Sequence, residues 1–364
     1  MKIHKATRGY ESWLARHVRV IEADLAHKHQ AMAENAFSFL RATFYRWAQL
    51  WPSVCRKLAE APRVLAVGDL HVENFGTWRD AEGRLAWGVN DFDEAHPLSY
   101  ANDLVRLSAS VLLAIRSDHL AFDPAVACEA ILEGYCRSIE AGGKPFIIEE
   151  GHRWFAPLID QQARNPTRFW QKLRELPAMQ DDPPRGALKG IRSILPAENM
   201  EVRLCHRVAG LGSLGRPRIV ALGDWHGGPI AREAKAVAPS GCAWAASKSN
   251  PIRYGPTLLQ SAIRCPDPMF VIGDRWVVRR LSPECSRVEL TGLPKPHDDL
   301  KLLHAMGWET ANVHLGSHDR MKKVATDLKR RRGKWLGKAA GDMLEATLAD
   351  WSRWRAGTKD QAGS

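Results

Sequence analysis

Apolar residues recur every three or four positions over much of the chain, which is the spacing of one face of an α-helix. Between residues 10 and 55 this pattern predicts two helices, the second of which ends at Pro52. The same period predicts helices over 99–116 and 124–139, and it resumes from His297 to the C-terminus. These faces are expected to form the core of a largely helical part.

Short apolar or alternating runs predict strands elsewhere. A buried strand is expected at 63–67, and a turn signal within 77–89 predicts a hairpin. After the proline-rich segment 177–186, which we interpret as a linker between two lobes, the pattern changes to that of a sheet. The strands predicted there are 201–207, 218–222, 230–237 and 269–281.

The composition is that of a soluble globular protein. The chain has 364 residues, with 45% hydrophobic and 26% charged residues, enough for roughly two domains. Its longest apolar run, 108–115, is far shorter than the roughly 20 residues that cross a bilayer. The N-terminus lacks the apolar stretch of a secretory signal. We therefore expect a cytoplasmic protein without membrane association, and its seven cysteines, without a CxxC pair, favour reduced thiols.

A formal charge of +11 favours an anionic partner, which charge alone does not identify. The densest basic segment, 320–338, is typical of a solvated helical face, and no base-reading motif accompanies it. Any binding of nucleic acid is expected to be non-specific and sensitive to salt. A small-molecule or nucleotide ligand is the favoured partner.

The strongest candidate site combines GDLHVEN with NDFD at 90–93. Asp69 ends the predicted strand, Asn74 follows five residues later, and Asp91 comes after the hairpin. Oxygen ligands of this kind suit magnesium, and phosphoryl transfer also needs a carboxylate to orient the attacking hydroxyl. Asp69 would take the hydroxyl, and Asn74 and Asp91 would hold the metal. The alternative is that these side chains only bond the backbone of turns or cap a helix.

A second candidate is the glycine-rich sequence GLGSLG, with Gly210, Gly212, Ser213 and Gly215. A Rossmann turn must open a helix, whereas this segment continues into a predicted strand. We therefore interpret it as a hairpin whose backbone lies over nucleotide phosphates. Lys235, on the strand after next, would pair with those phosphates. A plain surface hairpin is the alternative.

A third pattern competes with the first. GDxH occurs at 68–71 and again at 223–226, and an Asp-x-His after a strand can open a two-metal phosphoesterase site. The further bridging ligands that such a site needs are not found at local spacing, so this interpretation ranks below the others.

These residues carry a resemblance to known families. GDLHVENFG, NDFDEA and DLVRLSAS are similar to blocks of the bacterial "domain of unknown function 2252" family, and FSFLRATFYRWA, VAGLGSLG, REAKAV, WVVRRLS and NVHLGSHD follow the same order. GDLHVEN also resembles the catalytic loop of aminoglycoside and choline phosphotransferases, which are relatives of protein kinases, and NDFDEA resembles their metal-binding segment.

The resemblance implies an α+β, two-lobed, protein-kinase-like fold in circularly permuted order, because Asp69 precedes the glycine-rich sequence and its lysine. Residues 1–200 would form a large helical lobe and 201–283 a small β-rich nucleotide-binding lobe, and the helices of 284–364 would complete the large lobe. Permutation is tolerable because a site depends on geometry rather than chain order. Asp103 would brace the catalytic loop.

The function implied is an ATP- and Mg²⁺-dependent phosphotransferase acting on a small hydroxyl compound, with His71 and Asp93 as accessory residues. A kinase-like lysine usually pairs with a glutamate on a helix, but the candidate helix 254–263 offers only Gln260. Glu233 or another acid would then have to substitute. Because this glutamate is missing, a non-catalytic, nucleotide-binding scaffold protein is an alternative function. Transfer of AMP instead of phosphate is a further alternative.

Overall fold

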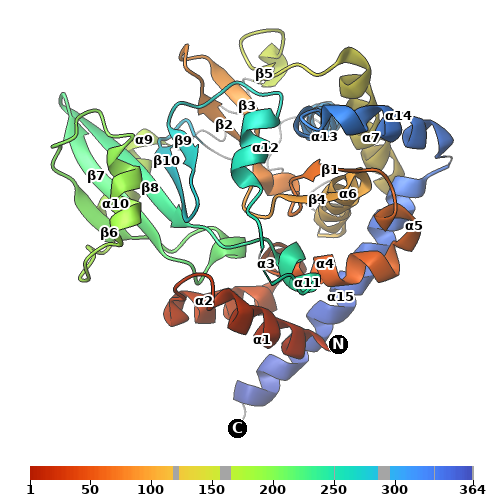
Figure 1. The fold of residues 1–364 in the computed structure, drawn as a ribbon, viewed down its shortest axis with the longest axis horizontal. Coiled ribbons are helices and arrows are strands. Elements are labelled where there is room, and N and C mark those ends of the chain that lie inside the picture. The colour runs from red at the N-terminus through yellow and green to blue at the C-terminus, as the bar shows by residue number, and fades with distance from the viewer. Residues whose placement is uncertain (118–122, 156–164, 250, 286–295, 332, 363–364) are drawn as a thin grey trace.

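An antiparallel five-stranded sheet forms one side of the molecule, and helices form the other (Figure 1). The computed structural model describes residues 1–117, 123–155, 165–249, 251–285, 296–331 and 333–362. The strands of the sheet lie in the order β6-β7-β8-β10-β9. Their bounds are β6 Arg203–His206, β7 Arg218–Trp225, β8 Gly228–Ala236, β9 Phe270–Ile272 and β10 Trp276–Leu281. The predicted strand at 269–281 is therefore two strands.

Two helices cover opposite faces of this sheet. α9 (Pro166–Arg174) packs on the face that carries Val220, and α10 (Arg185–Arg192) packs on the face that carries Ile219 and Ala234. The alternation of side chains along a strand makes this possible, because neighbouring residues point to opposite faces. Both helices precede residue 200, the predicted start of the β-rich lobe, and yet lie on the sheet. The helical pattern of the sequence also predicts a helix over 160–176, of which residues 160–164 lie outside the described residues.

Long helices form the core of the other side. α6 (Tyr100–Arg116) is buried over nearly its whole length, as a helix surrounded by others must be. α7 (Pro124–Ala141) and α13 (Pro296–His314) approach closely at Gly134 and Gly307, where a Cβ atom would collide with the backbone of the facing helix. The remaining long helices are α14 His318–Arg330 and α15 Trp335–Ala362.

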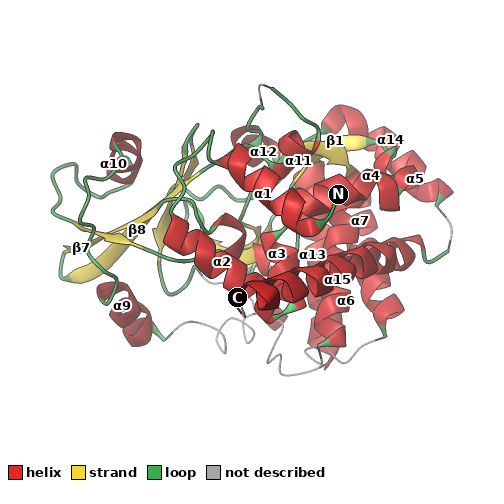
Figure 2. Ribbon diagram, turned by 90° about the horizontal axis from the view of Figure 1, so that it is seen from below, coloured by secondary structure: helices red, strands yellow, loops and turns green. Residues whose placement is uncertain are grey.

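Residues 3–54 form four helices, α1 to α4, rather than the two predicted, and the short helix α5 follows them. Asn35 accepts a hydrogen bond from the backbone N–H of Ser38 and so starts a new helix within the apolar pattern. Ile3 and Trp354 share a small core cluster, so the first and last helices lie side by side (Figure 2). The bounds are α1 Ile3–Leu14, α2 Glu22–Glu34, α3 Ala36–Ala42, α4 Phe44–Val54 and α5 Arg56–Ala59.

Two small sheets connect these parts. The predicted hairpin is formed by β2 (Phe75–Arg79) and β3 (Leu85–Val89), and β5 (Phe146–Ile147) extends it. β1 (Arg63–Ala66) pairs with β4 (His96–Ser99). The ends of β1 and β3 open into the two loops that carry the candidate residues. The short helices are η1 Val72–Asn74, η2 Arg153–Phe155, η3 Leu211–Ser213, α11 Gly241–Ala245 and α12 Gly255–Ser261.

This architecture confirms the α+β class expected from the sequence. Within the described residues, the structure contains no helix with the length and apolarity needed to span a bilayer. The seven cysteines all lie in the described part of the chain and are unpaired.

A buried carboxyl group in α13 gives a testable dependence of stability on pH. Glu309 is 3% exposed, and its Oε1 accepts a hydrogen bond from Asn312 at 2.7 Å. Burial raises the pKa of Glu309 to about 8, although Asn312 and Arg264 oppose the shift. The folded protein therefore holds this proton more tightly than the unfolded chain does. Stability from this group is lost as the pH rises from about 4.5 to about 8.

Glu309→Gln removes the titration and keeps an oxygen for Asn312. We expect the free energy of unfolding of wild type to fall relative to this variant between pH 5 and pH 8, by about 1.4 kcal/mol for each pKa unit. Urea unfolding of both proteins at several pH values measures the difference. A difference that stays constant over this range would contradict the assignment.

Candidate functional site

The loop after β1 is held in place by hydrogen bonds to Asp103 of α6. The Asp103 carboxylate accepts hydrogen bonds from the backbone N–H groups of Val67 at 2.6 Å and Gly68 at 2.9 Å. His314 lies 3.1 Å from the same carboxylate. Gly68 has φ of 84° and its Cα faces the carbonyl of Glu94, so a side chain there would collide. These contacts fix the direction in which the next residue, Asp69, leaves the strand.

Asp69 is bound by a buried arginine. Its Oδ1 accepts a hydrogen bond from Arg106 Nε at 2.7 Å, and Arg106 is 1% exposed. The guanidinium group of Arg106 lies over the rings of Phe44 and Trp47, at 5.1 and 4.8 Å from their centroids. Burial raises the pKa of Asp69 despite the opposing effect of Arg106, and nearby Asp91 raises it further. Sequence reasoning missed Arg106, although it lies in the block DLVRLSAS.

Asn74 and His71 stand on the same loop. Asn74 donates from Nδ2 to the carbonyl of Asp69, which is the turn contact expected from the structural alternative. Its Oδ1 accepts no hydrogen bond within the described structure, and this oxygen is available for a cation. Asn90 donates its N–H to the carbonyl of Asn74 at 3.0 Å, which joins the two candidate segments. His71 is 4% exposed, and its Nδ1 accepts from the backbone of Glu73.

Lys235 forms ion pairs with two aspartates of the segment 90–93. Its Nζ lies 3.3 Å from Asp91 Oδ1 and 2.8 Å from Asp93 Oδ2, and its side chain is 6% exposed. Burial works against ionisation of Asp91, but Lys235, Arg279 and Arg218 hold its pKa well below the usual range. Residues separated by more than 140 positions thus share one charged cluster.

The glycine-rich segment connects β6 and β7, as expected of a hairpin, but its tip is folded back rather than extended. Gly210 and Gly215 have φ of 75° and 91°, which other residues rarely adopt. An added Cβ at Gly212 would lie 3.6 Å from Asp69 Oδ2, so the segment covers Asp69. Ser213 accepts a hydrogen bond at its Oγ from Arg218 at 2.8 Å.

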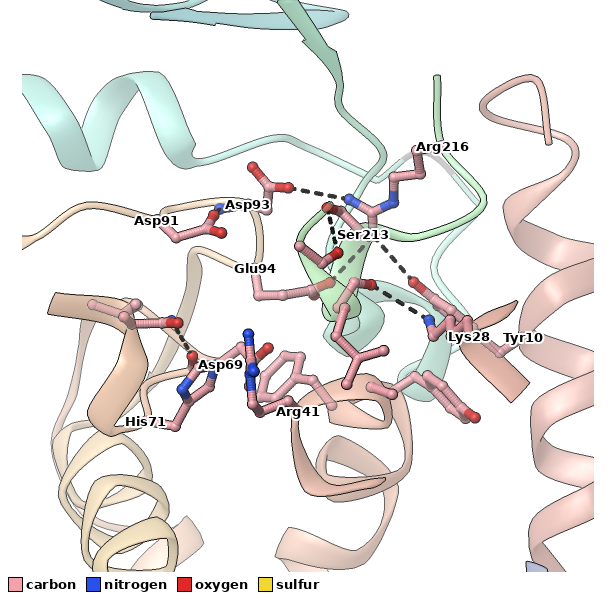
Figure 3. A pocket seen from close by; sticks show the side chains of 18 residues that line it. Tyr10, Lys28, Arg41, Asp69, His71, Asp91, Asp93, Glu94, Ser213 and Arg216 are labelled. Atoms are coloured by element: carbon pink, nitrogen blue, oxygen red, sulfur yellow. Dashed lines mark hydrogen bonds and ion pairs between the residues drawn. The ribbon is translucent and has the colours of Figure 1, made fainter. Parts of the chain in front are cut away.

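Two buried clusters of ion pairs surround these residues, and neither was expected. Arg216 contacts Asp93 at 3.3 Å and Glu94 at 3.5 Å (Figure 3). Glu233 is fully buried and binds three guanidinium groups. Its partners are Arg207 at 2.5 Å, Arg218 at 2.8 Å and Arg279 at 2.9 Å.

The suggestion that Glu233 replaces the missing glutamate partner of Lys235 is wrong, because the carboxylate of Glu233 is occupied by arginines. Gln260 is exposed. The acids that pair with Lys235 are Asp91 and Asp93, which come from the loop after β3 rather than from a helix. Lys235 is therefore paired with acids other than Glu233.

Two cavities meet at this cluster. The larger, of about 200 Å³, is lined by Lys235, Arg279 and Trp78, and the smaller, of about 40 Å³, by Asp69 and His71. Both are lined by Asn74, Asp91 and Gly210. The candidate residues therefore stand at the junction of a wide chamber and a narrow one.

The residues that could hold a divalent cation are Asn74 and Asp91, which would leave most of its ligand positions to phosphates and water, as magnesium requires. Within the described chain, no group of three or more His, Cys, Asp or Glu side chains could hold a metal ion.

The second GDxH copy forms the β7–β8 hairpin tip, where Trp225 pairs with Gly228. Along β8, Gly228 at this tip and Lys235 are seven residues apart, which corresponds to roughly 23 Å in an extended strand.

A comparison with known protein families finds a match to the N-terminal part of the chain. Residues 19–155 match a family described as "Uncharacterized protein conserved in bacteria (DUF2252)". This range includes Asp69, Asn74, Asp91 and Asp103, and it ends before the glycine-rich segment. It supports the relationship to that bacterial family. Comparison with curated proteins and with solved structures finds no match.

The Glu233 cluster gives a prediction about stability. Removing one member of a buried ion pair costs about 3–5 kcal/mol, because the remaining charges are left buried without compensation. We expect Glu233→Gln to lower the free energy of unfolding by an amount in this range, measured by urea denaturation. Glu60→Gln, which breaks the exposed pair with Arg56, is the control and should change little. Equal small effects of both substitutions would show that the cluster does not stabilise the sheet.

Proposed function

We propose that this protein is an ATP- and Mg²⁺-dependent phosphotransferase that acts on a hydroxyl group of a small molecule. The observation that carries the proposal is the meeting of Lys235 with Asp91 on the wall of one cavity, with Asn74 and Asp69 beside it. A cation for phosphates, oxygen ligands for a metal and a carboxylate for the hydroxyl are the parts that phosphoryl transfer requires.

The arrangement of the sheet supports a kinase-like site. In protein kinases a glycine-rich loop covers the phosphates and the lysine lies on the third strand. Here the glycine-rich segment joins β6 and β7, the first two strands of the five-stranded sheet, and Lys235 lies on the third, β8. Since Asp69 precedes both in the chain, the proposal includes a circular permutation of that fold.

The charge of the larger cavity supports a polyanionic ligand. Its lining includes three acids, Glu73, Asp91 and Asp267, and twice as many basic side chains. The basic residues are Arg207, Arg218, Lys235, Arg264, Arg279 and Arg280. Three of these arginines share the buried carboxylate of Glu233, and Lys235 is paired with Asp91 and Asp93, so a smaller excess of positive charge remains for a polyanionic ligand to offset. Trp78 and Phe270 also line this cavity, and the guanidinium group of Arg264 lies over both rings, at 4.3 and 5.9 Å from their centroids.

Each residue has a defined task in this proposal. Lys235 binds the phosphates, and Asn74 and Asp91 hold magnesium, which neutralises charge on the transferred group when it is bound. Asp69 accepts a hydrogen bond from the acceptor hydroxyl and directs it at the phosphorus. Arg106 keeps the Asp69 carboxylate in place, and Asp103 keeps the loop in place. Most of the rate would come from positioning and electrostatics.

One observation favours a second candidate, a nucleotide-binding protein without transferase activity. Asp69 is held by Arg106 on one side and covered by Gly212 on the other, and the chamber beside it measures about 40 Å³. An acceptor reaches Asp69 only if the glycine-rich segment moves. A protein in which it never moves would bind nucleotide and transfer nothing.

Nucleotide binding provides the first test. We expect wild type to bind ATP more tightly with Mg²⁺ than without it, and Asp91→Asn to lose at least tenfold in affinity for the Mg²⁺ complex because a charged ligand is removed. Lys235→Met should weaken binding under both conditions. Calorimetric titration measures these affinities, with Asp224→Asn at the distant hairpin tip as the control. Absence of ATP binding by wild type would refute both candidates.

Turnover separates the two candidates. We expect Asp69→Asn to bind Mg²⁺ and ATP within about threefold of wild type but to lose at least a hundredfold in rate, the typical contribution of a positioned acid or base. Release of ADP in the presence of a panel of hydroxyl compounds measures this rate, and mass spectrometry of the products distinguishes phosphate transfer from AMP transfer. Binding without turnover by wild type would instead support the non-catalytic protein.

A further inference from the structure

Lys28 is a buried cation without an acidic partner. It lies on α2, is 3% exposed, and its Nζ donates one long hydrogen bond of 3.4 Å to the carbonyl of Gly212. Within the described part of the chain it forms no ion pair. Burial lowers the pKa of Lys28 to about 8, and nearby Arg216 acts in the same direction. The carboxylates of Glu11, Glu94 and Asp69 oppose this shift without forming an ion pair with Lys28. A buried ammonium group without a direct ionic partner is costly to a fold, so its presence calls for an explanation.

Arg41 is a second cation with an unused hydrogen-bond donor. It lies on α3, and its Nη1 is 2.6 Å from Glu73 Oε2, whereas its Nε is buried without a hydrogen-bond partner. Most buried guanidinium and ammonium groups in proteins have their donors occupied. In contrast, the neighbouring Arg216 has partners in Asp93, Glu94 and Tyr10. The two incomplete donors therefore stand out from an otherwise well-paired cluster.

Both side chains line the smaller cavity together with Asp69, and neither lines the larger one (Figure 3). A volume of about 40 Å³ holds about three water-sized spheres. This is the size of a phosphate or carboxylate group rather than of a sugar or a nucleoside. Because the cavity is so small, a group inside it lies close to all of its walls, which also carry four carboxylates, those of Asp69, Asp91, Asp93 and Glu94. Each of these is paired with a cation other than Lys28 and Arg41: Asp69 with Arg106, Asp91 and Asp93 with Lys235, and Glu94 with Arg216.

We propose that Lys28 and Arg41 form an oxyanion subsite on the Asp69 side of the cleft, separate from the donor cavity, which takes a phosphate or carboxylate group. Its role in catalysis rests on the proposed function. The oxyanion comes either from the γ-phosphate of the donor or from an anionic group of the acceptor. An acceptor source would make the acceptor an acidic hydroxyl compound rather than a basic one.

Inorganic phosphate is the probe for this subsite. A ligand that binds only the folded state raises the melting temperature. We expect phosphate to stabilise wild type more than sodium chloride of equal ionic strength does. Lys28→Met should weaken phosphate binding at least tenfold, and Arg41→Met at least threefold. Lys57→Met, an exposed lysine on α5, is the matched control and should behave as wild type.

A comparison of ATP with ADP identifies the source of the oxyanion. If it is the γ-phosphate, Lys28→Met lowers affinity for ATP and leaves that for ADP unchanged. If it belongs to the acceptor, both affinities stay unchanged. Absence of a phosphate-specific shift in wild type, or an equal shift in Lys28→Met, overturns the subsite. Phosphate binding that depends on Lys28 but not on Lys235, in a protein that fails to bind ATP, would refute the proposed function and leave the subsite standing.

Discussion

The ion pairs of Lys235 with Asp91 and Asp93 connect the two sides of this molecule. The lysine comes from the third strand of the five-stranded sheet, whereas the aspartates follow the hairpin that leads into α6. Together with the pairs of Arg216 with Asp93 and Glu94, this contact joins the segment before β7 and strand β8 to the loop after β3.

Buried charges elsewhere in the site are arranged around this contact. Asp69 is paired with Arg106, Arg216 with two acids, and Glu233 with three arginines. Buried ion pairs add little net stability, because desolvation offsets much of their attraction. Their effect here is geometric, since each carboxylate is held at one place among several cations. The exception is Lys28, which forms no direct ion pair within the described residues, and that exception distinguishes the narrow chamber from the wide one.

The sequence was most informative where one local rule determined the outcome. α6, α7 and the β2–β3 hairpin lie close to their predicted positions, since periodicity and turn residues act over a few neighbours. It was least informative where a competing local contact, or a contact with residues distant in the chain, intervened. The Asn35 cap divides one apolar pattern into separate helices, and the sheet attracts α9 and α10 by contacts with residues more than thirty positions away.

The candidate residues and their chemistry came from the sequence alone: the Asp69 loop, the Asp91 segment, the glycines and Lys235 are all read from short motifs. The residues that contact them could not be predicted from the sequence. Arg106, Arg216, Lys28 and the three arginines around Glu233 carry no local signal, because a charged residue on a helix or strand is usually exposed. Only folding decides which charges are removed from water and which acid each one meets, and that pairing determines the electrostatics of the site.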